Sequence, residues 1–596
     1  MHRTAVLLAV CAAACGRVGF DALSDGASAG LDAVDASSTP RSLVLPTGGQ
    51  ISRITFAPNG DWYALSRTAG GFRSTDQGMT WTRCGARDGT AIAVTSDGAV
   101  WMSGLDVGRS VDNCATWTDT LNPRPSEAVF AEGANIWALC DTGLRKWGGM
   151  TWVVVTTPLD NNAFMRMAHG GARYFIGTLT QGVMTSPDAI TWTQAPLTAF
   201  ASPEIRGIAA GTNATYAITA GGNNNIACSD ATGTTWTNCY GAGGIAIAVD
   251  PTNNQRAMAA IYDDLGVTTN GFGAVTRGIR QPSMDSAIVE DLSYLANGDI
   301  VAATDRGVFV APSGTTNFAP RLAGLDAWDV DDISQDGDDI WVSTRGGPLH
   351  SVGGAPFTLG TSGITGNTTT RHVRVMPDGR LVAAGRNLYI SADRGDTWSM
   401  LQAMNNTDGY YVADIAFRGT RMFVATGARL LVSDPPYTTY TPVTFPGGNH
   451  PANDLFVAGS NVWIGTDRGL HVSQDNGASI LPIASLGTRN IRSILDLPDG
   501  RMLVGTTDGV WISDVAQTSF VRAGLSAVLV DGLTLVNDAV IAATAVGVRY
   551  TRDAGTTWTP LPGAETIPSS ATLVDDTTGQ LIVGTDTRGL IRVPLP

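Results

Sequence analysis

Apolar and polar residues alternate in short runs along almost the whole chain, and each run ends in a turn. One clear example starts with Ile491–Leu497, passes a Pro-Asp-Gly turn, continues through Arg501–Gly505 and ends with Val510–Ser513. An apolar period of two residues predicts β-strands, because successive side chains of a strand point to opposite faces. Similar runs occupy residues 373–391, 453–473 and 572–592. No stretch of about ten residues has the period of a helix, so the pattern predicts an all-β protein.

A second pattern, Ser-x-Asp-x-Gly-x-Thr-Trp, follows many of these runs and is clearest at Ser391–Trp398. An Asp side chain can bond backbone N–H groups and hold a turn, and Gly tolerates the positive φ of a tight hairpin. The Trp then offers a large apolar surface to a neighbouring layer. Full or near-full copies stand at 74–81, 110–117 and 551–558, whereas the segments near 270–276, 313–318 and 351–357 keep only the spacing.

Both patterns recur about every forty residues, which gives four short antiparallel strands in each repeat. Such repeats are typical of β-propellers, whose blades are four-stranded sheets arranged around a channel. Fourteen repeats exceed one ring, so we predict two seven-bladed propellers at residues 41–322 and 323–596, with six plus eight blades as the alternative. The last repeat lacks an outer strand, and we expect Arg41–Pro46 to close its blade as an added strand.

The turn pattern closely resembles the Asp-box, or bacterial neuraminidase repeat, family. In that family the boxes join the third and fourth strands on the face away from known active sites, which implies a structural role here. The residues that match are Ser74, Asp76, Gly78, Trp81, Ser110, Asp112, Trp117, Ser391, Asp393, Gly395, Trp398, Ser473, Asp475, Gly477, Thr551, Asp553, Gly555 and Trp558.

The N-terminus has the features of a bacterial export signal. His2-Arg3 precedes the apolar run Ala5–Ala14, which is too short to span a bilayer but suits a signal peptide. Ala12–Gly16 resembles a lipobox, with Ala12 in place of the usual Leu, and this implies lipidation of Cys15. We therefore expect a signal peptide at residues 1–14 and a Gly-, Ala- and Ser-rich tether at 15–40. Gly16 after the Cys implies the outer membrane or cell surface, with full secretion as the alternative.

Composition narrows the class of partner. The formal net charge of −15 argues against a nucleic-acid or anionic-lipid ligand. Lys146 is the only lysine and five residues are Glu, so almost all charge is carried by Arg and Asp, and Asp favours turns over helices.

Export permits disulfide bonds between the remaining cysteines. Cys228 and Cys239 stand symmetrically about one turn, so we predict a bridge across that hairpin. Cys84, Cys114 and Cys140 form an odd set, for which we predict one pair and one thiol. Neither Cys-x-x-Cys spacing nor a His cluster is present, and we expect no metal and no cofactor.

Two groups of charged residues are candidates for chemistry. Loops between second and third strands carry Arg306, Arg345, Arg386, Arg429, Arg468 and Arg588, which form either an anion-binding face or solvated turns paired with adjacent Asp residues. The Asp-rich segment 326–339 lacks the residue order of a calcium loop, and its register instead predicts a strand at Val330–Ser334. Asp329, Asp331 and Asp332, near the join between the two propellers, nevertheless remain candidates for a metal or carboxylate site.

The resemblance implies two classes of function. Sialidases share the box, but the Phe/Tyr-Arg-Ile-Pro motif of that family is absent here. Xyloglucanase-type hydrolases are tandem seven-bladed propellers with a catalytic Asp from each ring, and sortilin-like propellers resemble this chain in the turn Val249–Asn253. Repeats of about forty residues leave only short loops, which build shallow faces. We therefore predict a monomeric, non-catalytic scaffold that binds a protein or a glycan at the cell envelope, with a glycoside hydrolase acting between the propellers as the alternative.

Overall fold

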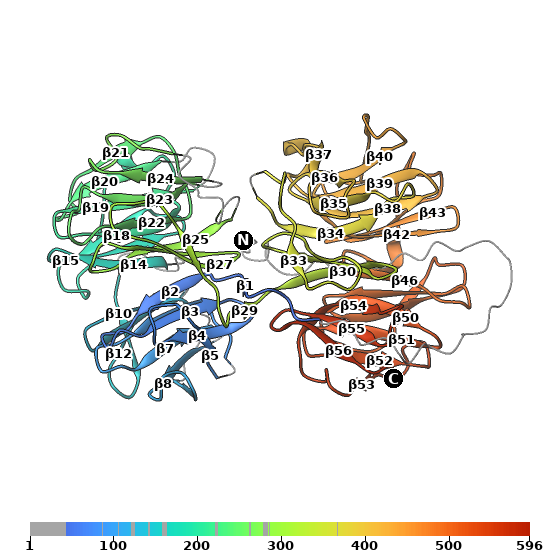
Figure 1. The fold of residues 1–596 in the computed structure, drawn as a ribbon, viewed down its shortest axis with the longest axis horizontal. Helices are drawn as coiled ribbons and strands as arrows, with labels where there is room; N and C mark the ends of the chain where they lie inside the picture. The colour runs from blue at the N-terminus through green and yellow to red at the C-terminus, as the bar shows by residue number, and fades with distance from the viewer. Residues whose placement is uncertain are drawn as a thin grey trace. The chain divides into compact units, whose positions relative to one another are not determined.

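The computed structural model describes residues 43–596 except 86, 105, 121–125, 141–142, 158–163, 221–224, 262–263, 278–283, 285–286 and 366. The predicted signal peptide, the lipidation site Cys15 and the tether 15–40 lie outside the described residues. The chain divides into two compact units, which we call the N-terminal unit (Thr47–Ala327) and the C-terminal unit (residues 43–46 and Trp328–Pro596). Figure 1 colours the first in blue and green and the second in yellow to red.

Among the described residues, the N-terminal unit contains seven antiparallel sheets and one short parallel pair. The sheets are β2–β5 (Arg53–Phe56, Trp62–Ser66, Gly70–Ser74, Thr82–Arg83), β6–β9 (Ala91–Val94, Val100–Ser103, Val107–Ser110, Thr118–Asp119), β10–β13 (Ser126–Glu132, Asn135–Cys140, Gly143–Trp147, Trp152–Val155), β14–β17 (Phe164–Gly170, Arg173–Thr178, Val183–Ser186, Thr193–Gln194), β18–β21 (Ile205–Ala210, Ala214–Thr219, Ile226–Asp230, Trp236–Tyr240), β22–β24 (Ala246–Val249, Ala257–Ile261, Asp264–Thr268) and β25–β28 (Val289–Tyr294, Ile300–Thr304, Gly307–Ala311, Ala319–Arg321). The pair is β1 (Gly48–Gly49) with β29 (Asp326–Ala327), and η1 (Leu197–Ala199) is a single 3-10 turn.

The described part of the C-terminal unit also contains seven sheets. They are β30–β33 (Val330–Asp336, Asp339–Thr344, Leu349–Ser351, Thr358–Leu359), β34–β37 (Thr370–Val375, Leu381–Gly385, Leu388–Ser391, Ser399–Gln402), β38–β41 (Val412–Arg418, Arg421–Thr426, Arg429–Ser433, Thr441–Thr444), β42–β45 (Ala452–Ala458, Asn461–Thr466, Gly469–Ser473, Leu481–Pro482), β46–β49 (Ile491–Asp496, Met502–Thr506, Gly509–Ser513, Phe520–Arg522), β50–β53 (Val530–Val536, Ala539–Thr544, Arg549–Thr551, Thr559–Pro560) and β54–β56 (Ser569–Val574, Leu581–Thr585, Gly589–Val593). Two 3-10 turns, η3 (Asn406–Asp408) and η4 (Ala484–Leu486), lie in its connections.

Each unit is closed into a ring by its first strands. The first strand of every sheet contacts the first strand of the next sheet, and the last sheet returns to the first through β25 with β2 and through β54 with β30. Alternation along these strands places apolar side chains between neighbouring sheets, which is the arrangement of a β-propeller. Each unit is therefore a ring of seven blades among the described residues.

The boundary between the units differs slightly from the expected join at 322–323. Gly48–Gly49 pairs in parallel with Asp326–Ala327, so the first and last segments of the N-terminal unit are held together by backbone hydrogen bonds. These bonds keep residues up to Ala327 in the first ring. Trp328 begins the second ring, and its indole N–H donates to the carbonyl oxygen of Pro46 at 2.6 Å.

The segment that precedes the first ring lies against the last blade of the second ring. Leu43 and Leu45 pack on an apolar cluster that joins the first and last sheets of the C-terminal unit and includes Trp328 and Leu590. Residues 43–46 form no strand, which differs from the closing strand predicted at Arg41–Pro46, of which residues 41–42 lie outside the described residues. Pro46 has no N–H to donate to a ladder, so the segment contributes side chains rather than a regular edge.

We expect the double substitution Leu43→Ala with Leu45→Ala to destabilise the C-terminal unit by roughly 2 to 4 kcal/mol, because both half-buried side chains lose apolar contacts. Calorimetry should show a lower melting temperature for one of the two rings. Val44→Ala is the matched control, since the Val44 side chain is 76% exposed. Equal melting profiles for the double variant and this control would rule out a closing role for the segment.

Candidate functional site

The turns that match the box pattern share one hydrogen-bond arrangement. In the turn at Ser391, the serine Oγ donates to Asp393 Oδ1 at 2.7 Å and accepts the N–H of Gly395 at 2.9 Å. Asp393 Oδ1 also accepts the N–H of Thr397 at 2.9 Å. Gly395 has a φ of 102°, a value that glycine adopts without strain. The hydroxyl of Thr397 donates to Asp393 Oδ2, so both carboxylate oxygens hold the hairpin.

The same bonds recur at the other predicted positions. Ser74 with Asp76, Ser110 with Asp112, Ser473 with Asp475 and Thr551 with Asp553 each make the hydroxyl-to-carboxylate bond at 2.7 to 2.8 Å. Their hydroxyls accept the N–H groups of Gly78, Cys114, Gly477 and Gly555. Cys114 occupies the glycine position with a φ of 67°.

The box tryptophans anchor these turns to the preceding blade or connection. The indole N–H of Trp81 donates to the Arg321 carbonyl, that of Trp398 to Gly360, and that of Trp558 to Ala523, all between 2.8 and 3.0 Å. Trp117 is half-buried, and the guanidinium of Arg87 lies 5.8 Å from its ring centroid. These contacts leave no role for the four rings as an exposed sugar platform.

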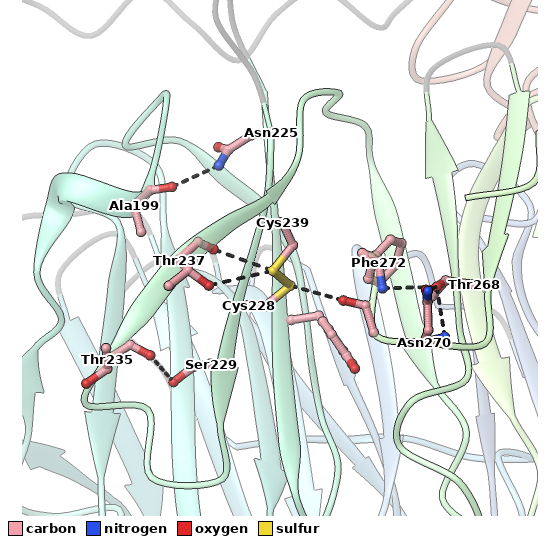
Figure 2. The surroundings of a disulfide bond; sticks show 12 residues. Ala199, Asn225, Cys228, Ser229, Thr235, Thr237, Cys239, Thr268, Asn270 and Phe272 are labelled. Atoms are coloured by element: carbon pink, nitrogen blue, oxygen red, sulfur yellow. Dashed lines mark hydrogen bonds between the residues drawn. A yellow bond between two sulfur atoms is a disulfide. The ribbon is translucent and has the colours of Figure 1, made fainter. Parts of the chain in front are cut away.

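One degraded repeat keeps more of this chemistry than its sequence suggests. Near residue 270 we expected spacing without chemistry, but Thr268 Oγ donates to Asn270 Oδ1 at 3.0 Å and accepts the N–H of Phe272 at 2.9 Å, as Figure 2 shows. Thr replaces Ser and Asn replaces Asp, so the hydrogen bonds of the box are kept although its residue types have changed. The neutral amide performs the structural task of the carboxylate.

Ionisation of the box carboxylates follows from the same bonds. Hydrogen bonds from Thr397 and Ser391 lower the pKa of Asp393 to about 2, and equivalent donors lower the pKa values of Asp76, Asp112 and Asp475 to about 2. A carboxylate with so low a pKa is a poor proton donor at neutral pH. The boxes are therefore structural.

Two disulfides lie in the N-terminal unit. Cys228 and Cys239 join the outer strands β20 and β21 of one blade, with an S–S distance of 2.08 Å (Figure 2). Cys84 and Cys114 join the end of the first blade to the box turn of the second. Cys140 remains a buried thiol.

The predicted loop arginines occupy different environments. Arg306 is buried in the N-terminal unit, and Arg429 pairs with Asp408 while donating to Thr407 Oγ1 at 2.8 Å. Arg386, Arg468 and Arg588 are exposed on the C-terminal unit, where Arg468 lies 3.9 Å from Asp467. Arg345 is half-buried. The six residues are thus not a continuous basic ring.

Threonine hydroxyls explain why these loops are so tight, a role that sequence reasoning missed. In the loop after β43, Thr466 Oγ donates to the Gly469 carbonyl at 2.8 Å and accepts the N–H of Arg468 at 3.1 Å. Equivalent hydroxyl bonds to the carbonyl three or four residues ahead are made by Thr304, Thr344, Thr426, Thr506, Thr544 and Thr585. The Thr that recurs at the end of most second strands, six of them in the C-terminal unit, was the available signal.

The open carboxylate site near the start of the C-terminal unit has unusual electrostatics. Burial, followed by repulsion from Asp331, raises the pKa of Asp329 to about 7, with a further contribution from Asp531. Arg345 opposes this shift. Asp332 instead faces the next blade, where its Oδ2 lies 2.9 Å from His372 Nδ1. The pKa of Asp329 is therefore raised into the neutral range, so that this carboxyl group is partly protonated near pH 7.

Inner-strand carboxylates also tie neighbouring blades of the second ring together. Asp414 Oδ2 accepts the N–H of Leu455 at 2.9 Å, and Asp454 Oδ2 accepts the N–H of Ile494 at 2.7 Å. In the first ring Asp291 Oδ2 accepts the N–H of Ile54 at 3.3 Å. A bulge one residue earlier in β25, β38 and β42 turns these Asp side chains toward the next blade.

The channel of the N-terminal unit holds a cavity of about 380 Å³. Its wall is formed by the inner strands β2, β6, β10, β14, β18, β22 and β25, and its charged lining residues are Arg53, Arg166 and Asp291. Within the described chain, no three His, Cys, Asp or Glu side chains gather as a metal site. The described helical turns include none long and apolar enough to cross a membrane.

Comparison with known proteins finds its matches among solved structures. No family model matches the chain, and no curated protein matches it. The GH74 xyloglucanase from Xanthomonas campestris aligns with a TM-score of 0.56 at 15% identity, over 93% of this chain and 99% of that one. The GH74 enzyme of Niastella koreensis gives 0.53 at 16% identity over 93% and 99% of the two chains, and an ancestral GH74 enzyme gives 0.53 at 13% over 94% and 99%. The shared feature is the β-propeller fold. At this identity the likeness extends to the fold alone.

We expect Asp393→Ala to lower the melting temperature of the C-terminal unit by a few degrees at pH 7, because three hydrogen-bond donors lose their acceptor. The folded pKa of Asp393 lies below its ordinary value, so its contribution is present above about pH 4 and disappears as the pH falls toward 2. Asp538→Ala is the control, since Asp538 forms only an exposed pair with Arg552. The proposed role fails if the two variants melt alike at pH 7, or if their difference persists at pH 2.

Proposed function

We propose that this protein is an exported, lipid-anchored, non-catalytic double β-propeller that binds a protein or a glycan at the cell envelope. The observation that carries the proposal is the brevity of the loops on the face where second and third strands meet. Only two residues separate Thr426 from Arg429, Thr466 from Gly469 and Thr506 from Gly509. Loops of this length cannot fold over a small substrate, and they build a shallow face suited to a large partner.

The side chains on this face support a polar contact. Arg386, Arg468 and Arg588 are exposed, and Asp508 accepts hydrogen bonds from Arg522 and from the N–H of Ala527. Protein and glycan partners are both recognised by such mixtures of charged donors and acceptors. Hydroxyl-bonded turns hold the loops in place, so binding would order little of the chain, which lowers its entropic cost.

The Asp-box resemblance and the export signal complete the proposal. The repeated Ser–Asp–Gly hydrogen bonds support the family resemblance at the level of the turn. The lipobox-like sequence before Gly16 supports an anchor at Cys15, and the acidic, Gly-rich stretch that follows suits a tether between membrane and ring. The anchor would leave the second-third loops available to partners at the outer membrane or cell surface.

A second candidate function, glycoside hydrolysis, is favoured by one observation. Asp329 has a raised pKa of about 7 and lies near Asp331 and Asp531. Glycosidases pair a protonated carboxylic acid with an ionised carboxylate, and burial with a neighbouring charge is how such a pair is produced. In this alternative Asp329 would donate the proton and Asp331 would act as base or nucleophile.

Assays of the purified protein separate the two functions. We expect no turnover of xyloglucan, mixed-linkage β-glucan or sialosides between pH 5 and pH 8, because the short loops leave the carboxyl cluster without an enclosing cleft. Clear turnover that is lost in both Asp329→Asn and Asp331→Asn, but kept in Asp538→Asn, would replace the binding proposal with the hydrolase. Asp538 is the control because its carboxylate is exposed and paired with Arg552.

Substitution of Cys15 tests the anchor. In a bacterial host supplied with labelled palmitate, we expect the natural sequence to take up label and to sediment with membranes. Cys15→Ser should take up no label and should remain in the soluble envelope fraction, with the melting profile of its rings unchanged. Cys140→Ser serves as a control for the loss of a thiol. A soluble natural protein without label would favour full secretion.

A further inference from the structure

The channel of the N-terminal unit contains a ring of seven residues at one level. In the strand pairing they face, in chain order, Leu65, Ser103, Leu139, Gly177, Ile218, Ala260 and Ala303 of the second strands. The seven residues are Arg53, Ala91, Ala128, Arg166, Gly207, Ala246 and Asp291. Four blades thus place only Ala or Gly at this level, and the other three place a charged side chain there. This composition accounts for the cavity of about 380 Å³.

The C-terminal unit carries a different set of residues at the same level, with three aspartates and a histidine among them. Its equivalent residues are Asp332, His372, Asp414, Asp454, Ser493, Gly532 and Ala571. Arg374 joins Asp332 to Asp414, while Asp414 and Asp454 accept N–H groups of the next blade. Several charged groups of that ring are therefore paired with one another or with the backbone of the next blade.

The two arginines of the N-terminal channel are arranged differently. Arg166 Nη1 donates to the carbonyl oxygen of its neighbour Met165 at 2.9 Å, and Arg53 bonds the carbonyl oxygen of Ser52. Asp291, the acidic member of the level, already accepts the N–H of Ile54. Burial, and then repulsion from Arg53, lowers the pKa of Arg166 to about 9, while attraction to Asp291 works in the opposite direction. Arg67 also lowers and Glu290 also raises the pKa of Arg166, so three guanidinium groups and two carboxylates leave an excess of one positive charge around the cavity.

Most of the other residues that line the cavity are apolar, although polar atoms form the larger part of its surface. Ile54, Val129, Ile208, Ile247 and Leu292 line it together with alanines from neighbouring strands. Ligand pockets of about 300 to 1,000 Å³ typically combine such walls with a few polar groups that fix orientation. A single negative charge would neutralise the excess positive charge, whereas a phosphate dianion would leave the apolar walls unused and overcompensate the charge.

We propose that the N-terminal channel is a binding site for a small organic monocarboxylate, whose carboxylate lies between Arg53 and Arg166 and whose apolar body packs on the isoleucine and leucine side chains of the inner strands. This site is independent of the proposed partner-binding role, because the scaffold partner would contact the loops of the faces. Arg166 is the principal determinant, since its planar donor group matches a carboxylate.

Hexanoate and its neutral isostere hexanamide test this site on the full-length protein by saturation-transfer NMR and calorimetry. We expect hexanoate to bind at least about tenfold more tightly than hexanamide, because only the carboxylate meets the guanidinium groups. Arg166→Gln should weaken hexanoate binding about tenfold or more and leave hexanamide unaffected. Arg173→Gln is the matched control, since Arg173 lies on the same blade, outside the cavity wall, with Nη1 3.5 Å from Thr185 Oγ1.

A second variant tests the cavity without changing charge. Ala246→Leu should abolish the binding of hexanoate by filling the space next to Ile247, with the melting profile as a check on folding. Equal binding of hexanoate and hexanamide, or unchanged hexanoate binding in Arg166→Gln, would overturn the proposal. Displacement of hexanoate by inorganic phosphate at equal concentration would also overturn it, because it would show a general anion site rather than one for carboxylates. Loss of this binding would leave the scaffold proposal untouched.

Discussion

Every blade of either ring depends on the side chains of its neighbours to cover its two faces. A four-stranded sheet of about twenty residues cannot bury enough surface alone, so stability comes from the apolar layers between sheets. In one such layer Trp463 and Leu470 of one blade meet Ile494 and Val504 of the next. The inner-strand carboxylates add a directional bond at the same junction, as Asp454 does with the N–H of Ile494. Closure of the ring lets every blade share in this burial.

Much of the fold could be predicted because its signals are local and repeated. The two-residue alternation around Ile491–Leu497 and the box at Ser391–Trp398 each describe a structure that forms within one repeat. Four strands in each repeat follow from those signals alone. The box residues also revealed their role, since Asp393 bonds atoms no more than four residues away.

Features that depend on distant segments were missed or left open. The level that contains Arg53 and Arg166 becomes visible only when the inner strands are aligned through their pairing, because bulges shift several strands by one residue. Cys84 pairs with Cys114 rather than with Cys140 because the first blade ends beside the second box turn, which spacing does not reveal. Thr268 and Asn270 form the hydrogen bond of a box although neither is the residue type that defines the motif. Function is harder still, because the propeller fold serves both enzymes and binding proteins.

The evidence for binding or for hydrolysis therefore depends on what surrounds the charged side chains of each ring. In the box turns, donors surround each carboxylate and keep it ionised, whereas at Asp329 burial and a like charge raise the pKa of the carboxyl group. The first ring reverses the sign, since its channel carries an excess of guanidinium over carboxylate. One architecture thus holds structural anions, a carboxyl group of raised pKa and a cationic cavity by changing only what surrounds each group.

The Cys84–Cys114 bond has a consequence for how the first ring would respond to proteases. It joins two consecutive blades through a residue that also sits at the glycine position of a box turn. A single cut in the chain between the two cysteines would leave both fragments covalently linked, with the apolar layer that includes Tyr63, Val100 and Met102 still in contact. Nicking in this stretch would then go unnoticed in a native or non-reducing separation and would appear only after reduction. The disulfide would therefore hold the first two blades together after such a cleavage.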